Sequence, residues 1–162
     1  LRCRSALTVS KSSMSISVVQ AELKHLELLV PLLDAYRVFY SQASDAGGAE
    51  SFLDERLENQ DSVILIALAE GKEAVGFIQL YPSFTSIRMR PIWIINDLYV
   101  VPGARRQGVA RQLMQAARDV AARTRASSLE FVVGRENTGA KALYESLGCK
   151  PDAAFDHYHL DI

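Results

Sequence analysis

The stretch VVPGARRQGVARQLM, residues 100–114, combines arginines with small residues where a helix is expected to begin. Within it, Arg105, Gly108 and Ala110 form the spacing R-x-x-G-x-A directly after a strand-like run. The first N–H groups of a helix have no partner inside the helix, and the peptide dipoles give that end a partial positive charge. Small residues let an anion approach these groups, and arginines add charge-assisted hydrogen bonds. The stretch therefore predicts an anion site suited to a diphosphate.

This anion site does not match the common nucleotide-binding patterns. A Walker motif needs GxxxxGK(S/T) and a dinucleotide-binding turn needs GxGxxG, and the stretch carries neither of them. A nucleoside triphosphate and a nicotinamide dinucleotide are therefore poor candidates for the ligand. Taken alone, the stretch also fits an exposed basic helix start in which Gly108 is only a turn residue.

A second motif, NTGAKALYESLGC, occupies residues 137–149. Asn137 precedes an expected helix, Tyr144 lies on its apolar face, and Gly148 follows its end as a stop signal. Together the two motifs resemble the GNAT family of N-acetyltransferases, whose signatures are (Q/R)-x-x-G-x-(G/A) and an Asn followed by a helix carrying L-Y-x-x-x-G. The resemblance covers residues 16–162.

The resemblance implies acetyl-CoA as the cofactor and CoA as a product. In the family, backbone N–H groups at the end of the central strand bind the pantetheine arm and polarise the thioester carbonyl. The amides of the following turn and helix hold the pyrophosphate, and residues of the later helix border the cofactor. Carried over to this sequence, the cofactor-binding residues are Leu98, Tyr99, Val100, Arg105, Arg106, Gln107, Gly108, Val109, Ala110, Arg111, Asn137, Ala140 and Lys141.

The catalytic candidates are Tyr144, Asn96 and Asp97. Tyr144 matches the family's tyrosine near the thioester sulfur and would protonate the departing sulfur as a general acid, although an isolated tyrosine there also fits a packed aromatic. Some relatives keep a glutamate where Asn96 stands, and an asparagine cannot take a proton. A water held by Asn96, Asp97 on a twisted or bulged strand, and loss of the proton to solvent are the alternative proton routes. Asp97 equally fits a structural carboxylate that caps an amide.

Side chains alternate between the two faces of a strand, and this alternation separates Asn96 from Asp97 on the predicted central strand. Asn96 and Asp97 are predicted to point to opposite faces of the sheet. The two predicted faces are Ile94, Asn96, Leu98 and Val100 on one side, and Trp93, Ile95, Asp97 and Tyr99 on the other.

The segments AYRVFYSQASD and SFTSIRMRPIWIINDLYV resemble the yeast-type histone and polyamine acetyltransferase branch. In that branch, the first helices and the loop before the central strand border the acceptor. The substrate-side candidates are therefore Tyr36, Tyr40, Asp45 and Trp93. The two tyrosines also fit a buried helical stripe, and the tryptophan also fits a core strand.

The charged residues of the sequence do not decide whether the acceptor is cationic or carries a carboxylate. An acidic run between Asp45 and Asp61 would attract a cationic amine, although such a run is also typical of a solvated helix face. Arg88 and Arg90 would instead favour a substrate with a carboxylate, such as an amino acid. The predicted reaction is direct acetyl transfer to a small primary amine, which is a polyamine, an amino acid or a related amine. A protein or histone lysine is the runner-up, and a non-catalytic acyl-CoA-binding regulatory module is the alternative of another class.

Hydrophobic periodicity predicts the elements that must position these residues. Their order is strand, two helices, three strands, helix, strand, helix, strand. This order predicts a single α/β (α+β) domain of the GNAT fold, with a mixed, mostly antiparallel sheet and about four helices. The predicted helices are 23–40 with a kink at Pro31, 49–60, 108–124 and 137–147. The predicted strands are 16–21, a hairpin around residues 71–72, 91–101, 128–133 and the tail 153–162, with a loop over 82–90.

Bulk properties set the remaining expectations. The 162-residue chain has a formal net charge of −1, so no global field favours nucleic acid or an anionic membrane. No apolar run approaches the roughly 20 residues that span a bilayer. Cys3 and Cys149 lack metal-ligand spacing and are interpreted as free thiols of a cytoplasmic protein without a metal. Residues 1–13 are expected to lie outside the domain at 14–162, as a disordered upstream segment or a transit peptide. A homodimer formed through a sheet edge is also predicted.

Overall fold

The computed structural model describes residues 15–155 and 158–162 of the chain. The described chain divides into two compact units, a larger one that ends at Glu130 and a smaller one that begins at Phe131. The predicted segment outside the domain, residues 1–13, does not belong to the described residues.

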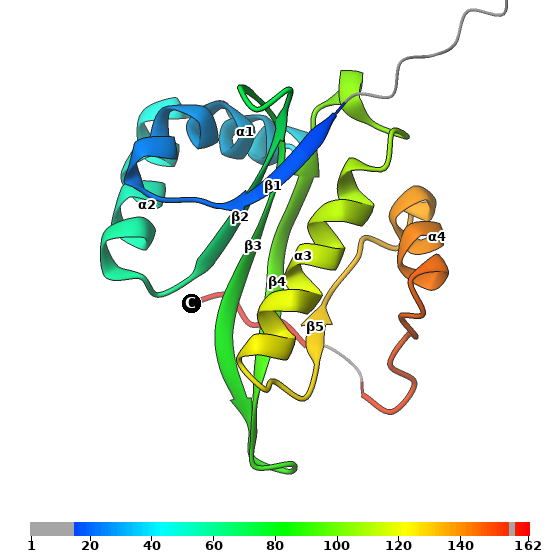
Figure 1. The fold of residues 1–162 in the computed structure, drawn as a ribbon. Helices are drawn as coiled ribbons and strands as arrows, with labels where there is room; N and C mark the ends of the chain where they lie inside the picture. The colour runs from blue at the N-terminus through cyan, green and yellow to red at the C-terminus, as the bar shows by residue number, and fades with distance from the viewer. Residues whose placement is uncertain (1–14, 156–157) are drawn as a thin grey trace, which may run out of the picture. The chain divides into compact units, whose positions relative to one another are not determined.

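The larger unit is built on a five-stranded sheet with the strand order β1-β2-β3-β4-β5 (Figure 1). The first four strands pair antiparallel with their neighbours, and β5 runs parallel to β4, so the sheet is mixed as predicted. The strands are β1 (Ile16–Gln20), β2 (Val63–Ala69), β3 (Glu73–Thr85), β4 (Arg90–Val100) and β5 (Leu129–Phe131). The helices are η1 (Leu23–His25), α1 (Leu26–Phe39), α2 (Ala46–Asn59), η2 (Pro102–Ala104) and α3 (Val109–Arg123).

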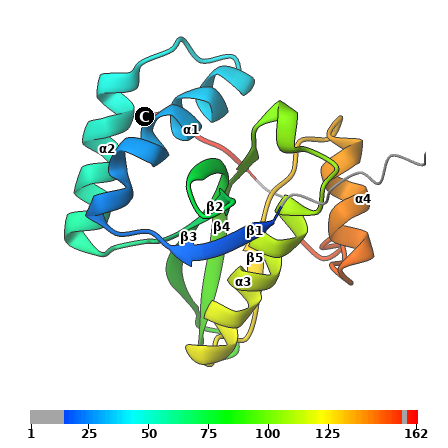
Figure 2. The same ribbon diagram turned by 45° about the horizontal axis from the view of Figure 1, so that its top comes forward.

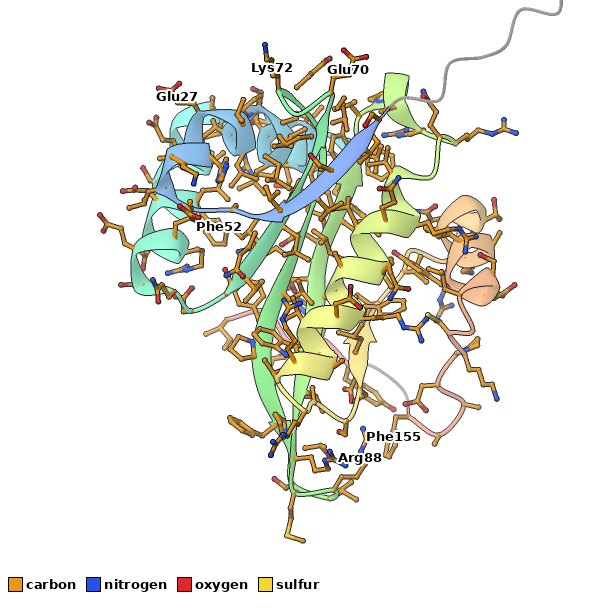
Figure 3. All side chains as sticks on the ribbon, viewed as in Figure 1. Glu27, Phe52, Glu70, Lys72, Arg88 and Phe155 are labelled. Atoms are coloured by element: carbon orange, nitrogen blue, oxygen red, sulfur yellow. The ribbon has the colours of Figure 1, made fainter. Side chains whose placement is uncertain are left out.

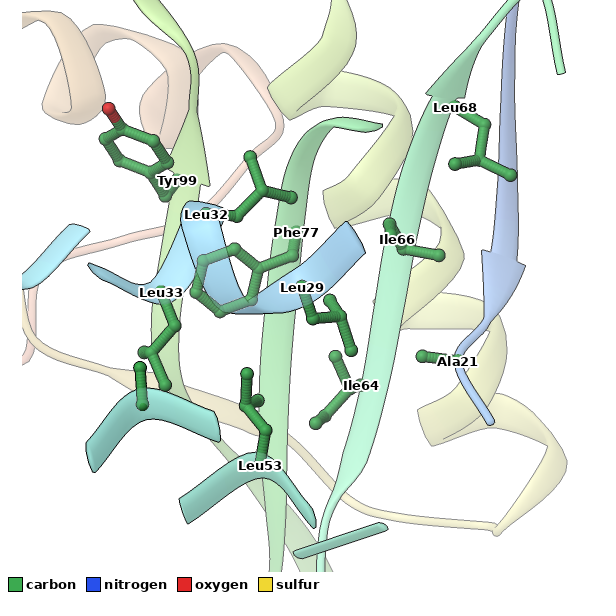
Figure 4. Close-up of a cluster of buried hydrophobic side chains, with 11 residues drawn as sticks. Ala21, Leu29, Leu32, Leu33, Leu53, Ile64, Ile66, Leu68, Phe77 and Tyr99 are labelled. Carbon is green, nitrogen blue, oxygen red and sulfur yellow. The ribbon is translucent and has the colours of Figure 1, made fainter. Parts of the chain in front are cut away.

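Helices cover both faces of this sheet (Figure 2). On one face, Leu29 of α1 and Leu53 of α2 pack against Ile66 and Phe77 of the sheet (Figure 4). Burial of each such side chain contributes about 1.5–3 kcal/mol, so this cluster fixes the two helices on the sheet. On the opposite face, α3 approaches so closely that a Cβ on Gly76 of β3 would lie 3.4 Å from Leu113 Cδ1.

The pairing of β3 with β4 contains a bulge at the centre of the sheet. Gln79 pairs with Asp97, but the next residue of β3, Leu80, pairs with Ile95, which leaves Asn96 as an extra residue in β4. An extra residue reverses the alternation of side chains on its N-terminal side. Asp97 and Tyr99 share one face of the sheet, as predicted. Ile95 and Trp93 lie on the other face, which α3 covers, so the prediction is wrong for these two residues. The bulge is the reason, because it reverses the alternation of the residues before Asn96.

The predicted loop over residues 82–90 is also wrong in its extent. Strand β3 continues to Thr85 and β4 begins at Arg90, so only residues 86–89 form the turn. Pro82 pairs with Trp93 of β4, whereas the pairing with β2 ends at Leu80. Proline lacks an N–H, and strand positions without a partner on one side tolerate it.

The described part of the smaller unit contains one helix, α4 (Thr138–Ser146). Within it, the ring of Tyr144 lies 4.6 Å from the ring of Phe131. The predicted last strand, residues 153–162, is wrong for its described part, which is irregular at 153–155 and 158–162. Among the described residues, no helix is long and apolar enough to cross a membrane, and no group of three His, Cys, Asp or Glu residues could hold a metal ion.

Candidate active site

The start of α3 is shaped by a glycine in the left-handed conformation. Gly108 is the N-cap of this helix with φ 85° and without a capping side chain, and the first helical bond runs from Gln112 N to Gly108 O over 3.1 Å. Val109 beside it is almost fully buried and anchors the first turn. A Cβ on Gly108 would meet no atom within 4 Å, so no other part of the described chain crowds this glycine. The geometry therefore suits the predicted anion site.

The arginine that opens the motif contacts β4 and α1 rather than the predicted anion site. The Arg105 side chain donates from Nε to Val100 O at 2.9 Å, and its guanidinium carbon lies 5.6 Å from the ring centre of Phe39 and 5.7 Å from that of Tyr99. The side chain thus ties the end of β4 to the end of α1. Of the predicted cofactor residues that follow, Arg106 has φ 60° and is exposed, and Gln107 donates to Gly103 O at 2.9 Å.

The end of β4 extends past its neighbouring strand. Trp93 N donates to Ser128 O at 3.1 Å, just before β5 begins, and β5 is only three residues long. No strand of the described residues pairs with that edge of β4 at Leu98–Val100. The backbone groups predicted to bind a pantetheine arm therefore belong to a strand end with a free edge.

Asp97 is a buried carboxyl beside this strand end. Its side chain is 8% exposed and lies on the sheet face under α1. Burial raises the pKa of Asp97, while hydrogen bonds from Tyr36 and Asn96 lower it in part. The Tyr36 hydroxyl also donates to the Asn96 carbonyl at 3.4 Å. A carboxylate with a raised pKa is a suitable proton acceptor, because it binds a proton more readily than an exposed one.

Comparison with known proteins identifies this arrangement. Residues 29–149 match the acetyltransferase (GNAT) family, and this range includes both sequence motifs. The chain belongs to the GNAT family.

Two relatives are similar to this GNAT chain over almost its whole length. The uncharacterized N-acetyltransferase YhfO of Bacillus subtilis (strain 168) is 46% identical over 147 residues, which are 91% of this chain and 98% of the relative. A crystal structure of a probable acetyltransferase has a TM-score of 0.85 at 43% identity and covers 90% of this chain and 97% of that chain. The protein is therefore an N-acetyltransferase, which is an acyltransferase.

A more distant structure shares the fold alone. The structure of AAC(6')-Iy in complex with the bisubstrate analog CoA-S-monomethyl-acetylneamine has a TM-score of 0.76 at 19% identity. It covers 91% of this chain and 99% of that chain. This likeness supports the GNAT architecture of a mixed sheet with helices on both faces.

The predicted substrate-side residues of the GNAT chain are only partly brought together. The Tyr36 ring lies 5.0 Å from that of Tyr40 and 6.3 Å from that of Tyr99, on the face that also holds Asp97. Asp45 instead caps α2 by accepting a hydrogen bond from Gly48 N at 2.8 Å. Trp93 lies on the opposite face, where its indole Nε1 donates to Thr124 Oγ1 at the end of α3, 2.8 Å away.

Two polar residues of β3 were missed by the sequence analysis. Gln79 lies opposite Asp97, is fully buried and donates to Ser62 Oγ at 2.8 Å. Tyr81 follows two residues later and is half-buried, and burial together with the charge of Asp97 raises its pKa to about 12. A glutamine and a tyrosine at alternate positions of the apolar run GFIQLY were the available signal.

In the smaller unit, the predicted residues are held by local bonds. Asn137 caps α4 by accepting a hydrogen bond from Ala140 N at 3.1 Å. Lys141 Nζ donates to the Arg135 carbonyl at 2.5 Å. Tyr144 lies one to two turns further along the same helix, so the second motif forms one short, capped element.

Proposed function

We propose that this GNAT protein transfers an acetyl group from acetyl-CoA directly to a primary amine of a small molecule. The observation that carries the proposal is the buried carboxyl of Asp97, which lies on β4 three residues before the strand end that leads to the anion site at Gly108. One strand-turn-helix segment thus carries a proton acceptor, which suits an amine, and then an anion-binding helix start, which suits the pyrophosphate of a CoA ester.

The residues of the larger unit are proposed to have different roles in binding and catalysis. Acetyl-CoA, when bound, supplies the thioester carbonyl that the amine attacks. The amides at the start of α3 hold its pyrophosphate, and the backbone at Leu98–Val100 holds the pantetheine arm and polarises the carbonyl oxygen. Asp97 accepts the proton that the amine loses as its nitrogen bonds to carbon. Asn96, the extra residue of the bulge, sets the position of Asp97 rather than acting as a base.

Tyr144 completes the proposal as the proton donor. The carbon–sulfur bond breaks as the carbon–nitrogen bond forms, and the sulfur needs a proton to leave as a neutral thiol. Tyr144 is proposed to supply that proton, and Asn137, Ala140 and Lys141 are proposed to border the cofactor. These roles rest on the match of the second motif to the family's pattern.

An amine panel with CoA release as readout tests the proposed reaction. We expect CoA release to accelerate with at least one small primary amine, and Tyr144→Phe to lower kcat about 10²-fold, because it removes the proposed acid. Measurable binding of acetyl-CoA without acceleration by any amine would favour the non-catalytic acyl-CoA-binding module instead. A full rate for Tyr144→Phe across the pH range would disprove only the role of this tyrosine.

A glycine pair tests the anion site. We expect Gly108→Ala to raise the dissociation constant of acetyl-CoA about tenfold, since an alanine is strained at φ 85° and its Cβ would occupy the open space before α3. Gly103→Ala is the matched control, because a Cβ there also meets nothing within 4 Å and its backbone needs no left-handed conformation. Isothermal titration calorimetry measures both variants, and equal affinities would argue against the site.

Several finer points stay predictions. A small-molecule acceptor is favoured over a protein lysine by the complex of AAC(6')-Iy with a bisubstrate analog, although that protein shares only the fold. A polyamine acceptor and the histone and polyamine branch rest on the sequence resemblance. The homodimer and the cytoplasmic location are expectations that acetyl transfer itself does not require.

A further inference from the structure

The segment that forms the helices over the Asp97 face has a net charge of −6. Between residues 26 and 62, the sequence has eight carboxylate side chains and two arginines, although the whole chain has a formal net charge of only −1. Residues 63–162, which include the anion site, carry twelve Lys or Arg and ten Asp or Glu, a net charge of +2. Such a separation of charge suits an anionic cofactor on one side and a cationic acceptor on the other. The carboxylates of this acidic segment are Glu27, Asp34, Asp45, Glu50, Asp54, Glu55, Glu58 and Asp61.

Both arginines of the acidic segment are already engaged. Arg37 Nη1 donates to the Ala43 carbonyl at 3.2 Å. Arg56 pairs with Glu55 at 2.7 Å and with Asp61 at 2.9 Å. Asp97 has no ion-pair partner in the part of the chain that the structure describes. No ion pair among the described residues therefore neutralises the Asp97 carboxylate, which can be paired by a cationic ligand.

The sheet face around Asp97 holds one buried hydrogen-bond acceptor that is unpaired among the described residues. Gln79, directly opposite Asp97, is fully buried, and its Oε1 has no hydrogen-bond partner among the described residues. Cross-strand partners share a face, so this oxygen belongs to the same polar cluster as the Asp97 carboxylate. An unpaired buried acceptor destabilises the protein, and a ligand that donates a hydrogen bond to it would recover part of that free energy.

The arginines that favoured an anionic acceptor lie elsewhere. Arg90 begins β4 and lies seven residues from Asp97, which is about 23 Å along a strand. It donates to the Arg125 carbonyl at 3.3 Å. Arg88 lies at the end of the β3–β4 hairpin (Figure 3). Its guanidinium pairs with Glu130 at 3.4 Å. Both guanidiniums are therefore engaged by other groups of the chain.

We propose that Gln79 and Tyr81 form, with Asp97 and Tyr36, a cation-selective acceptor pocket that takes alkyl diamines and rejects amines bearing a carboxylate. This inference rests on the proposed function. The reacting ammonium loses one proton to solvent and, as the neutral amine, donates a hydrogen bond to Asp97. The second ammonium donates to the oxygens of Gln79 and Tyr81, and the acidic segment adds only a general attraction. Tyr81 stays neutral, so its oxygen accepts an N–H group and its ring faces the alkyl chain without adding charge. A carboxylate at the far end would instead meet the charge of Asp97 and the unpaired oxygen of Gln79, at a cost of like-charge repulsion.

A series of matched four-carbon amines tests the selectivity. Butane-1,4-diamine, butylamine and 4-aminobutanoate share the reacting end and the chain length and differ in the charge of the far end. We expect kcat/KM to fall in that order, with about tenfold or more between the first and the last. Calorimetric binding of the same compounds to the whole protein should show the same order without turnover. Equal or better use and binding of 4-aminobutanoate would overturn the inference.

Three variants separate the pocket from the general field. Tyr81→Phe and Gln79→Met keep the size of the side chain, and each should reduce the preference for the diamine over 4-aminobutanoate about threefold or more. Glu27→Gln removes one charge from the same acidic segment at the other end of α1, about 14 Å from Tyr36, and should change the preference less than about twofold (Figure 3).

The possible results distinguish a failure of the proposed pocket from a failure of the proposed acetyl transfer. If Glu27→Gln alters the preference as much as Tyr81→Phe does, the acidic field and not the pocket selects the acceptor, and the inference is wrong. If no amine of a wider panel is acetylated but the diamine binds more tightly than 4-aminobutanoate, the proposed transfer fails and the cation-selective pocket stands. Thermal melting of each variant verifies that its fold is intact.

Discussion

Asp97→Asn should lower kcat/KM for acetyl transfer about 10²–10⁴-fold, because it removes the proposed proton acceptor while keeping its shape. The asparagine can still accept a hydrogen bond from Tyr36 but cannot take a proton from the amine. The loss should appear with every reactive amine, since deprotonation is common to all of them. Steady-state CoA release at saturating acetyl-CoA measures it.

The same change should raise stability. Burial raises the pKa of Asp97, so the folded state binds this proton more tightly than the unfolded chain does. The stability that the carboxyl contributes is present below its ordinary pKa and is lost as the pH rises through the raised value. At neutral pH the ionised Asp97 is therefore a net cost, and Asp97→Asn should melt at a higher temperature than the wild type.

The pH profile adds a third readout for this carboxyl. Wild-type kcat/KM should decline at acid pH as Asp97 becomes protonated, at a pH above the ordinary carboxyl range. That decline should be absent in Asp97→Asn. Asp119→Asn, a change of an exposed carboxylate on α3, is the matched control and should alter neither rate nor profile. An active Asp97→Asn variant with the wild-type profile would leave loss of the proton to solvent as the route.

Local signals explain why much of the fold could be predicted. Each helix of the larger unit carries its own apolar stripe, and Gly108 marks the start of α3 by a backbone need that few other residues meet. The face of Trp93 could not be predicted, because it depends on the extra residue Asn96. A bulge is a property of two paired strands, and alternation within one strand does not contain it.

The same reason separates the predicted from the missed site residues. Asp97 and Tyr36 stand out in their own segments, one as a carboxyl in an apolar strand and the other as an aromatic on a helix. Gln79 and Tyr81 gain a role only because the register places them beside Asp97. Asp45 looked like a ligand group in sequence, whereas its position before α2 makes it a helix cap.

Gly76→Ala should destabilise the protein more than any other single methyl group added to a glycine. A Cβ there would lie 2.6 Å from the Tyr99 carbonyl oxygen, 3.2 Å from Val100 Cγ2 and 3.4 Å from Leu113 Cδ1. The first neighbour is backbone of a central strand and cannot turn aside. Such overpacking costs about 1–3 kcal/mol, which lowers the melting temperature of a chain of this size by about 3–10 °C.

The matched control for Gly76→Ala is expected to stabilise the protein or leave its stability unchanged. Gly47→Ala adds the same methyl group within α2, where the nearest atom is Asp45 Oδ1 at 4.0 Å. Alanine favours a helix over glycine by up to about 1 kcal/mol, so this variant should melt at or above the wild-type temperature. Because Gly76 pairs with Val100, the clash should also displace the strand end proposed to hold acetyl-CoA. A Gly76→Ala variant with wild-type stability and cofactor affinity would show that β3 and β4 can separate there without cost.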